Sequence, residues 1–478
     1  MRICMIAEGS YPYITGGVSS WIHSIINQMP EHEFIIYAIG AQSKQKGNYK
    51  YKLPANVVEI KEVFLDAYLD EEGSWGQRFR LTAEQTHSIR SLLGGGEVVW
   101  SQLFDLLRTK KFQIAADFLS SKDYFDILEE MCRNQYSLVP FTEMFWTVRS
   151  MILPLFLTIR HDIPKADIYH SVSTGYAGVI GALAKHIHGA PLVLTEHGIY
   201  SREREEEIIK ADWVKGYFKD LWIEYFYTLS GCAYQASDQV ITLFNRNKEI
   251  QVELGCEESK ISIIPNGVNV DHFAGIPQAP KDGIIRIGAV VRVVPIKDIK
   301  TMLQSFALVK QEIPNAHLTI MGPTEEDESY YHECEQLVEA LGVQDVLFTG
   351  EVQVKDYLGQ MDILLLTSIS EGQPLAVLEG MACGKPFVTT NVGSCKELLN
   401  GVNDGIGLAG FVSPVMNYEP MALNIIKLCK SKSLREEMGR NALERVSLYY
   451  KDQEVIASYK QLYASLKEVK RWPESALS

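Results

Sequence analysis

The 478-residue sequence has no closely spaced cysteine pair and no long apolar run. Its eight cysteines are scattered without a Cys-x-x-Cys motif, so neither a zinc site nor a disulfide framework is indicated. The longest apolar stretch, "MILPLFLTI" at 151–159, is well short of the roughly 20 residues that a membrane-spanning helix needs. The opening "MRICMIAE" predicts a first strand rather than a signal peptide. We therefore expect a cytoplasmic protein, associated with a membrane at most through partners.

Basic residues are also in deficit. Lys and Arg number 46 against 60 Asp and Glu, which gives a net charge of −14. Because nucleic acids are bound by basic surfaces, no nucleic-acid partner is expected. A small phosphate ligand stays possible, since a pocket needs only one or two local cations. The sequence has no Asp-x-Asp element and no His/Cys cluster with metal-ligand spacing, so we expect no metal and no other cofactor.

Short β-rich runs alternate with segments of helical period along most of the chain. This pattern predicts parallel sheets covered by helices on both faces. The strands expected in the second half are 284–291, 317–322, 346–350, 362–368 and 386–390. Those expected in the first half are 2–8, 33–40, 57–63, 167–173, 191–197, 238–244 and 261–267. The predicted fold class is α/β, with two doubly wound, Rossmann-like domains that face each other across a cleft.

The domain limits follow from composition. We predict an N-terminal domain at 1–275 and a C-terminal domain at 276–450, with a hinge in the Pro- and Gly-containing segment 272–283. A helix-rich, aromatic region at about 41–160 interrupts the first domain and is interpreted as an insertion. The last segment, 451–478, is expected to form a helix that packs back on the N-terminal domain.

The stretch "SEGQPLAVLEGMACGKPFV" at 370–388 carries the strongest chemical signal. It follows a predicted strand, and ligands of open α/β sheets bind at the carboxyl ends of strands. Pro374 suits a first helical turn, so the amides of Gly372 and Gln373 would offer an anion site. Glu371 lies just outside this helix and Glu379 lies within it among small neighbours, where a carboxylate favours hydroxyl donors. For this spacing alone, a capped helix with two solvated acids is the stronger alternative.

Two cations follow another predicted strand of the same sheet. Arg292 and Lys297 lie in "VVRVVPIKD", after strand 284–291, and would therefore reach the same edge as the two glutamates. There they could neutralise a diphosphate and stabilise it as a leaving group. Taken alone, an Arg and a Lys at this spacing are more often surface charges.

The first half supplies two further candidates. Gly16 and Gly17 follow the first strand and would let a ligand approach the backbone, although a tight turn explains them as well. His197 ends a strand in "LTEHGIY", as either a ligand-contacting or a structural histidine. Asn266-Gly267 is interpreted as a turn. Ser394 and Glu397 are predicted to form a capping box, which leaves Glu397 outside the site.

As a set, these stretches resemble the retaining glycosyltransferases of family 4, which have the GT-B fold. The resemblance spans nearly all of the second half, and in the first half "YPYITGGVSSWI", "DIYHSVSTGYAGVIGALAK", "TEHGIY" and "IIPNGVNVDHF". The insertion and "TEHGIYSRERE" further resemble the glycosyltransferases of Pel-type exopolysaccharide assembly. One position departs from the pattern, because many relatives have an aromatic residue where this chain has Gln373.

The resemblance assigns roles to the candidate residues. Glu371 would contact the donor hexose, and Glu379 would hold the ribose. The backbone around the sugar and phosphate would be that of Gly372, Gln373, Pro374 and Leu375. Arg292 and Lys297 would bind the diphosphate, Gly16 and Gly17 would close on it, and Gly350 to Val352 would face the nucleobase. His197 would lie near the anomeric carbon, so the catalytic set would be His197, Arg292, Lys297 and Glu371.

The resemblance implies transfer of a hexosyl unit from a UDP-sugar, UDP-glucose above all, to a growing Pel-type exopolysaccharide. The expected partners are the donor, a glycan acceptor and a membrane-bound synthase complex, with the insertion as its docking surface. Two alternatives stay open. One is a UDP-sugar epimerase of similar fold, which should need further acid/base side chains in the cleft. The other is an inactive nucleotide-sugar-binding subunit of a polysaccharide assembly complex.

Overall fold

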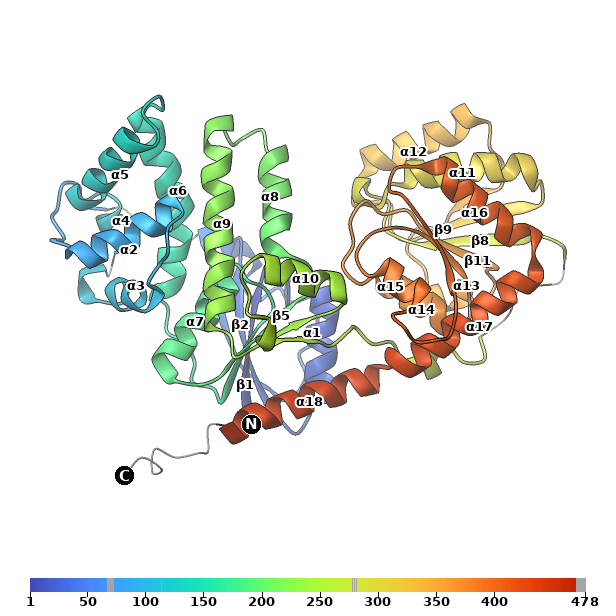
Figure 1. The fold of residues 1–478 in the computed structure, drawn as a ribbon, viewed down its shortest axis with the longest axis horizontal. Coiled ribbons are helices and arrows are strands. Elements are labelled where there is room, and N and C mark those ends of the chain that lie inside the picture. Colours follow the sequence, from blue (N-terminus) through green and yellow to red (C-terminus); the bar gives the residue numbers. More distant parts are fainter. Residues whose placement is uncertain (67–72, 113, 277, 279, 281, 470–478) are drawn as a thin grey trace. The chain divides into compact units, whose positions relative to one another are not determined.

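The computed structural model describes residues 1–66, 73–112, 114–276, 278, 280 and 282–469 (Figure 1). The chain divides into two compact units. Unit 1 contains residues 1–242, 248–263 and the segment from 460 onward, and unit 2 contains residues 243–247 and 264–459. Three residues of the predicted hinge, 277, 279 and 281, lie outside the described residues. The division itself lies between 263 and 264, so the segment 272–283 falls within unit 2.

Unit 1 is built on one parallel sheet with the order β3-β2-β1-β4-β5-β6-β7. Its apolar strands are mostly buried, as expected for a sheet with two covered faces. The strands are β1 (Arg2–Glu8), β2 (Glu33–Gly40), β3 (Val57–Phe64), β4 (Ile168–Ser171), β5 (Leu192–Glu196), β6 (Gln239–Thr242) and β7 (Ile261–Ile263).

Unit 2 repeats this plan with the order β10-β9-β8-β11-β12-β13, again with every neighbouring pair parallel. The predicted pair of doubly wound α/β units is therefore confirmed. The edge strand β13 is the one strand of unit 2 that the sequence pattern did not indicate. The strands are β8 (Ile285–Val290), β9 (Ala316–Met321), β10 (Val346–Phe348), β11 (Ile363–Leu366), β12 (Phe387–Thr390) and β13 (Gly410–Ser413).

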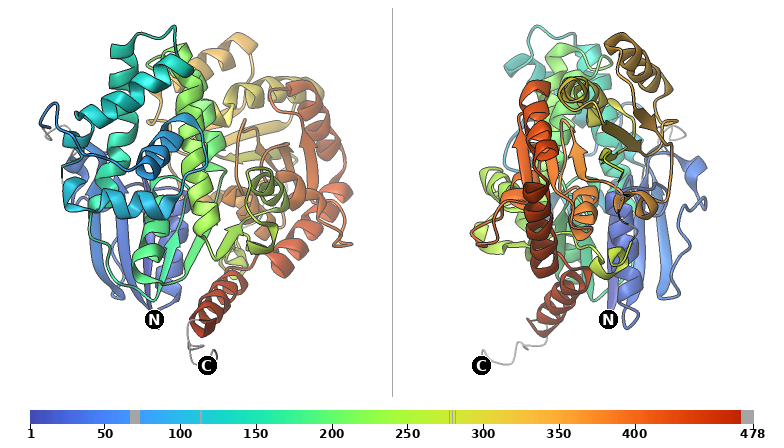
Figure 2. Two further views of the ribbon diagram at one scale, coloured as in Figure 1. Left: turned by 60° about the vertical axis from the view of Figure 1, so that its left-hand side comes forward. Right: turned by 90° about the vertical axis from the view of Figure 1, so that its right-hand side faces the viewer.

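Helices connect the strands and pack on the sheets (Figures 1 and 2). Those around the unit 1 sheet are α1 (Gly17–Gln28), α7 (Tyr176–His188), α8 (Tyr200–Lys210), α9 (Gly216–Ala236) and α10 (Asn245–Glu253). Those of unit 2 are α11 (Ile299–Glu312), α12 (Glu328–Leu341), α13 (Val354–Leu358), α14 (Leu375–Ala382), α15 (Cys395–Asn400), α16 (Tyr418–Lys430) and α17 (Lys432–Tyr449).

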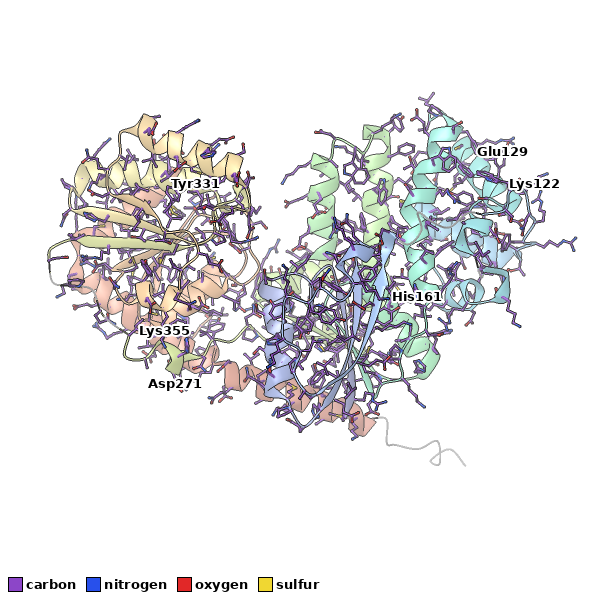
Figure 3. The ribbon with its side chains drawn as sticks, turned by 180° about the vertical axis from the view of Figure 1, so that it is seen from behind. Lys122, Glu129, His161, Asp271, Tyr331 and Lys355 are labelled. Carbon is purple, nitrogen blue, oxygen red and sulfur yellow. The ribbon has the colours of Figure 1, made fainter. Side chains whose placement is uncertain are left out.

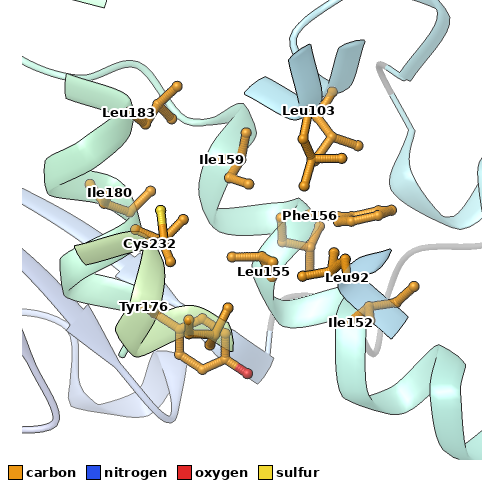
Figure 4. Packing of buried hydrophobic residues seen from close by; sticks show 14 of the residues in the cluster. Leu92, Leu103, Ile152, Leu155, Phe156, Ile159, Tyr176, Ile180, Leu183 and Cys232 are labelled. Carbon is orange, nitrogen blue, oxygen red and sulfur yellow. The ribbon is translucent and has the colours of Figure 1, made fainter. Parts of the chain in front are cut away.

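The predicted insertion is helical between β3 and β4. Its helices are α2 (Ala83–Gly94), α3 (Trp100–Leu107), α4 (Ala115–Phe118), α5 (Lys122–Asn134) and α6 (Phe141–Arg160). Lys122 and Glu129 mark α5 in Figure 3. Leu155 and Phe156 of α6 join Ile180 of α7 and Cys232 of α9 in one buried cluster (Figure 4). The insertion therefore shares the hydrophobic core of unit 1 rather than forming a core of its own.

The last helix, α18 (Asp452–Val469), begins in unit 2 and ends in unit 1. Its Lys460 Nζ lies 2.7 Å from the carboxylate of Glu31, and the Tyr463 hydroxyl lies 2.6 Å from His170 Nδ1. These contacts tie the end of the described chain to the loop before β2 and to β4. Among the described residues, no helix is long and apolar enough to cross a membrane.

Candidate functional site

The order of the unit 2 sheet reverses between β8 and β11, which are neighbours although β9 and β10 separate them in sequence. Open α/β sheets bind ligands outside the carboxyl ends of the strands at such a reversal. The loops that follow β8 and β11 lie there, and they are joined. The Ile369 N–H donates to Ile296 O at 2.9 Å, and the Thr367 hydroxyl donates to Lys297 O at 2.8 Å.

This joint brings Lys297 and Glu371 together. The Lys297 ammonium forms an ion pair with the Glu371 carboxylate, and the two side chains are only 17% and 12% exposed. The Ser368 hydroxyl donates to the same Glu371 oxygen at 2.5 Å. A cation and a carboxylate are thus fixed side by side at the sheet reversal. A phosphate bound here would compete with Glu371 for the ammonium.

Helix α14 begins beside this ion pair. Pro374 precedes the helix and has no N–H, and no side chain caps the helix start. Within the described residues, the amides of Leu375 and Ala376 donate no hydrogen bond, because they precede the first intrahelical donors. Such amides favour an anion. The turn before them is tightly packed, since a Cβ on Gly393 would lie 1.9 Å from Gly372 O.

Gln373 has a partner within the protein. Its side-chain oxygen accepts the N–H of Asn266 at 2.5 Å, and its backbone oxygen accepts the Asn266 side-chain amide at 3.4 Å. Gln373 is buried, and these two hydrogen bonds fix the turn at Asn266. That turn also needs Gly267, whose Cβ would lie 2.5 Å from the backbone of Asp452.

Glu379 lies on α14 with its carboxylate largely covered. Burial raises the pKa of this carboxyl to about 6. None of the described residues forms a hydrogen bond or an ion pair with this carboxylate. A desolvated carboxylate without donors is unfavourable in the free protein and would gain by accepting ligand hydroxyl groups.

Arg292 is not brought to Glu371. Its side chain is 54% exposed and pairs at 2.7 Å with Glu326, in the loop after β9. Gly350 follows β10, and its carbonyl accepts the N–H of Gly322 at 3.0 Å. Val352 packs partly against the unit 2 core. Arg292 follows β8, as Lys297 does, whereas Gly350 and Val352 follow β10, which is two strands away from β8 in the sheet.

In unit 1, the sheet order reverses between β1 and β4. Gly16 and Gly17 follow β1, and a Cβ at either position would meet nothing within 4 Å. Packing within the described chain therefore does not require glycine there. Helix α1 starts at Gly17 and carries Trp21, whose ring lies edge-on to His197 with centroids 4.8 Å apart.

His197 follows β5, and its Nε2 atom is covered and accepts or donates no hydrogen bond within the described residues. Burial lowers the pKa of this imidazole to about 4, so His197 is neutral at physiological pH. A neutral imidazole can form a hydrogen bond with a ligand hydroxyl, but it adds no positive charge to a phosphate site.

The sequence analysis missed Glu8, which ends β1 at the unit 1 reversal. Its carboxylate accepts the N–H of Ala177 at 3.1 Å and the hydroxyl of Tyr200 at 3.2 Å. Burial raises the pKa of this carboxyl, although the Ala177 N–H and nearby Arg204 lower it in part. The available signal was a carboxylate directly after the apolar run "ICMIA".

The predicted capping box at Ser394 is wrong. Ser394 accepts the N–H of Leu398 through its backbone oxygen at 2.9 Å, but its side chain does not cap α15, and its hydroxyl is buried without a hydrogen-bond partner in the described structure. The Glu397 carboxylate instead accepts the side-chain amide of Asn245 at 2.8 Å and the N–H of Arg246 at 3.2 Å. Glu397 thus holds the start of α10. Among the described residues, no cluster of His, Cys, Asp or Glu is arranged for a metal ion.

Two family models match the chain. Residues 1–259 match "Domain of unknown function (DUF3492)", and residues 277–445 match "Glycosyl transferases group 1". One relative is the UDP-Gal:alpha-D-GlcNAc-diphosphoundecaprenol alpha-1,3-galactosyltransferase of Escherichia coli, 27% identical over 74% of this chain and 92% of its own. Another is the N-acetyl-alpha-D-glucosaminyl L-malate synthase of Bacillus anthracis, 24% identical over 78% and 94%.

Solved structures share the fold over almost the whole chain. The Anabaena protein HepE in complex with UDP superposes with a TM-score of 0.60 at 15% identity, over 97% of this chain and 100% of that one. Sucrose-phosphate synthase from Thermosynechococcus elongatus gives 0.61 at 14% identity, over 98% and 99%. At these identities the likeness concerns the fold, and both units take part in it.

Proposed function

We propose that this chain, a glycosyltransferase of the GT-B type, uses a UDP-sugar as donor. It belongs to the DUF3492 family over residues 1–259 and matches the group 1 glycosyl transferases over residues 277–445. It transfers a hexosyl unit to a growing exopolysaccharide, with retention at the anomeric carbon, as expected for family 4. UDP-glucose is the proposed hexosyl donor. The resemblance to PelF, the glycosyltransferase of Pel-type exopolysaccharide assembly, motivates the choice of donor and acceptor class.

One observation supports this proposal above the others: the Lys297–Glu371 ion pair lies beside the uncapped start of α14 at the reversal of the unit 2 sheet. A nucleoside diphosphate sugar matches this arrangement. Its diphosphate suits the ammonium and the helix amides, and its hexose hydroxyls suit Glu371. Its ribose hydroxyls would supply the donors that Glu379 lacks.

The proposed transfer uses these contacts. The bond between the anomeric carbon and the β-phosphate oxygen breaks, and the negative charge that develops on the phosphate is stabilised by Lys297 and the amides of α14. The acceptor hydroxyl adds to the anomeric carbon from the face that UDP leaves, and its proton passes to the phosphate oxygen. No protein nucleophile and no metal ion is needed. His197, being neutral, would orient a sugar hydroxyl.

The proposed partners are the donor, a glycan acceptor and a membrane-bound synthase complex that receives the protein at its surface. Two similar proteins support the donor class: HepE forms complexes with UDP and with UDP-glucose, and the E. coli relative is a UDP-Gal galactosyltransferase. The protein is proposed to act in the cytoplasm, where nucleotide sugars are available.

Measurement of UDP release from UDP-glucose, with and without added exopolysaccharide fragments, tests the proposal. A transferase releases UDP faster when acceptor is added and lengthens the glycan. An epimerase instead yields the epimeric UDP-sugar without UDP, and an inactive binding subunit yields neither product. Either of the last two results would overturn the proposed function.

A further inference from the structure

A concave surface lies on unit 1, near the start of α9 and away from the strands of the sheet. It is a cavity of about 340 Å³, within the size range of small-ligand pockets, and it lies between α6 and the segment that opens α9. Its lining residues are Thr142, Glu143, Trp146, Thr147, Ser150, Trp213, Val214, Lys215, Phe218 and Trp222. Three of the seven tryptophans of the chain are among them.

The position of this aromatic pocket separates it from the strand-end residues described above. Helix α9 leads from Gly216, beside the pocket, to Ala236, just before β6. Its 21 residues span about 30 Å at 1.5 Å per residue. Strand β6 has only four residues, so the pocket lies well beyond the carboxyl ends of the unit 1 strands.

The rings that line the pocket contact one another and their neighbours. Trp213 and Trp222 meet edge to face, with centroids 5.7 Å apart and planes at 83°. Trp222 is in turn stacked on Phe226 at 5.8 Å. On the facing helix, the Arg149 guanidinium lies 5.9 Å from the ring of Trp146. Trp146 is 51% exposed and Trp213 is 71% exposed, so both present open faces to a ligand.

The polar groups at the rim carry no net charge. The Glu143 carboxylate pairs with Lys215 Nζ at 2.8 Å and accepts the hydroxyl of Tyr217, and these two bonds lower the pKa of the Glu143 carboxyl. Hydroxyl groups of Thr142, Thr147 and Ser150 complete the lining. The pocket therefore offers aromatic faces together with neutral or paired hydrogen-bonding groups.

From this combination we infer that the aromatic pocket binds a neutral oligosaccharide segment. A pyranose ring presents an apolar C–H face, which complements an indole, and a rim of hydroxyl groups, which complements Thr, Ser, Glu and Lys side chains. Among the lining residues the two charged groups, Glu143 and Lys215, neutralise each other, and the net charge of −14 opposes an anionic ligand as well. The choice of a glycan rests on the proposed function, since the growing chain is the glycan at hand.

Binding is tested without donor, on an array of neutral oligosaccharides built from glucose, galactose, N-acetylglucosamine and N-acetylgalactosamine, followed by titration with the best binder. The full-length protein should bind at least one of them. Trp146→Ala and Trp213→Ala should each weaken this binding by roughly tenfold, because each removes an open ring face. Trp213→Tyr should retain most of the affinity, which a merely structural role would not predict.

Tyr449→Ala is the matched control, since Tyr449 is an equally exposed aromatic residue (51%) on α17 of unit 2. Absence of binding to every oligosaccharide, or binding that both tryptophan variants retain, would overturn the inference. Binding of the wild-type protein to phosphatidylglycerol vesicles that Trp213→Ala abolishes, without oligosaccharide binding, would assign the pocket to a membrane surface instead. The binding assay contains no donor, and transfer is measured separately as UDP release. A failure of the pocket proposal is therefore distinguishable from a failure of the proposed transferase.

Discussion

The ammonium of Lys297 and the carboxylate of Glu371 neutralise each other in side chains that are only 17% and 12% exposed. A bound diphosphate would therefore have to share Lys297 with Glu371. This competition distinguishes ligands that offer only phosphate from ligands that also offer sugar hydroxyls.

Glu371→Gln should separate these two classes. Lys297 loses its competitor in this variant, so UDP should bind at least as tightly as to the wild-type protein. UDP-glucose should lose the hexose contact, and transfer should fall by at least about tenfold, as expected for a charge-assisted hydrogen bond. Calorimetry with both ligands checks this. Equal weakening of UDP and UDP-glucose would contradict a hexose contact for Glu371.

Glu379→Gln should stabilise the free protein while weakening donor binding. The folded-state pKa of about 6 lies above the ordinary 4.5, so this carboxyl favours folding when protonated, and that contribution is lost as the pH rises through 6. At pH 7.5 the ionised group costs roughly 1–2 kcal/mol, which the amide removes. Thermal unfolding should show a higher midpoint for the variant at pH 7.5 and no such gain at pH 4.

The raised pKa of the Glu379 carboxyl predicts that donor binding depends on pH. The ionised form accepts ribose hydroxyl groups more strongly, so the affinity of the wild-type protein for UDP-glucose should fall as the pH drops below about 6. UDP-glucose suits this test because its diphosphate diester does not titrate in this range. A curve with the same step in Glu379→Gln would assign the titration to another group.

Gly17→Ala tests whether the turn after β1 serves a ligand. A Cβ there meets nothing within 4 Å, so the thermal midpoint should be unchanged. Transfer should nevertheless decrease, because a side chain would keep a donor from the backbone. Gly231→Ala on α9 is the control, since its Cβ is equally free of contacts. Unchanged kcat/KM in Gly17→Ala would remove this turn from the site.

Arg292 tests how many cations hold the diphosphate. Its exposed pair with Glu326 contributes less than about 1 kcal/mol, so the side chain can leave it readily for a phosphate. Arg292→Ala should then weaken UDP binding several-fold, and Glu326→Ala should not. Unchanged affinity in Arg292→Ala would leave Lys297 as the cation of the site.

The fold could be predicted because buried parallel strands are continuous apolar runs, as in "IIRIGAVV" and "DILLLTS". Strand β13 was not predicted, because it is four residues long and only partly buried, so its sequence is not a continuous apolar run. The sequence predicted that Lys297 and Glu371 lie at the same edge of one sheet, because each follows a parallel strand, but it did not predict their ion pair. The hydrogen-bond partners of the side chains could not be predicted from the sequence, because residues far along the chain supply them. Gln373 bonds Asn266, and Glu397 bonds Asn245 instead of its own helix.

The aromatic pocket could not be predicted from the sequence either. Its lining comes from two segments, 142–150 and 213–222, and neither carries a motif. Only the packing of α6 beside the start of α9 brings Trp146 near Trp213 and Trp222.

Calorimetric titration of UDP-glucose into wild-type protein, Lys297→Ala and Lys300→Ala tests the central claim most directly. Lys300 is a suitable control because it lies three residues along the chain and is likewise ion-paired, with Glu333 at 2.6 Å. The Lys297→Ala variant should bind at least about tenfold more weakly, and Lys300→Ala should bind as the wild-type protein does. Equal affinity of all three proteins for UDP-glucose would contradict a diphosphate site at Lys297 and the start of α14.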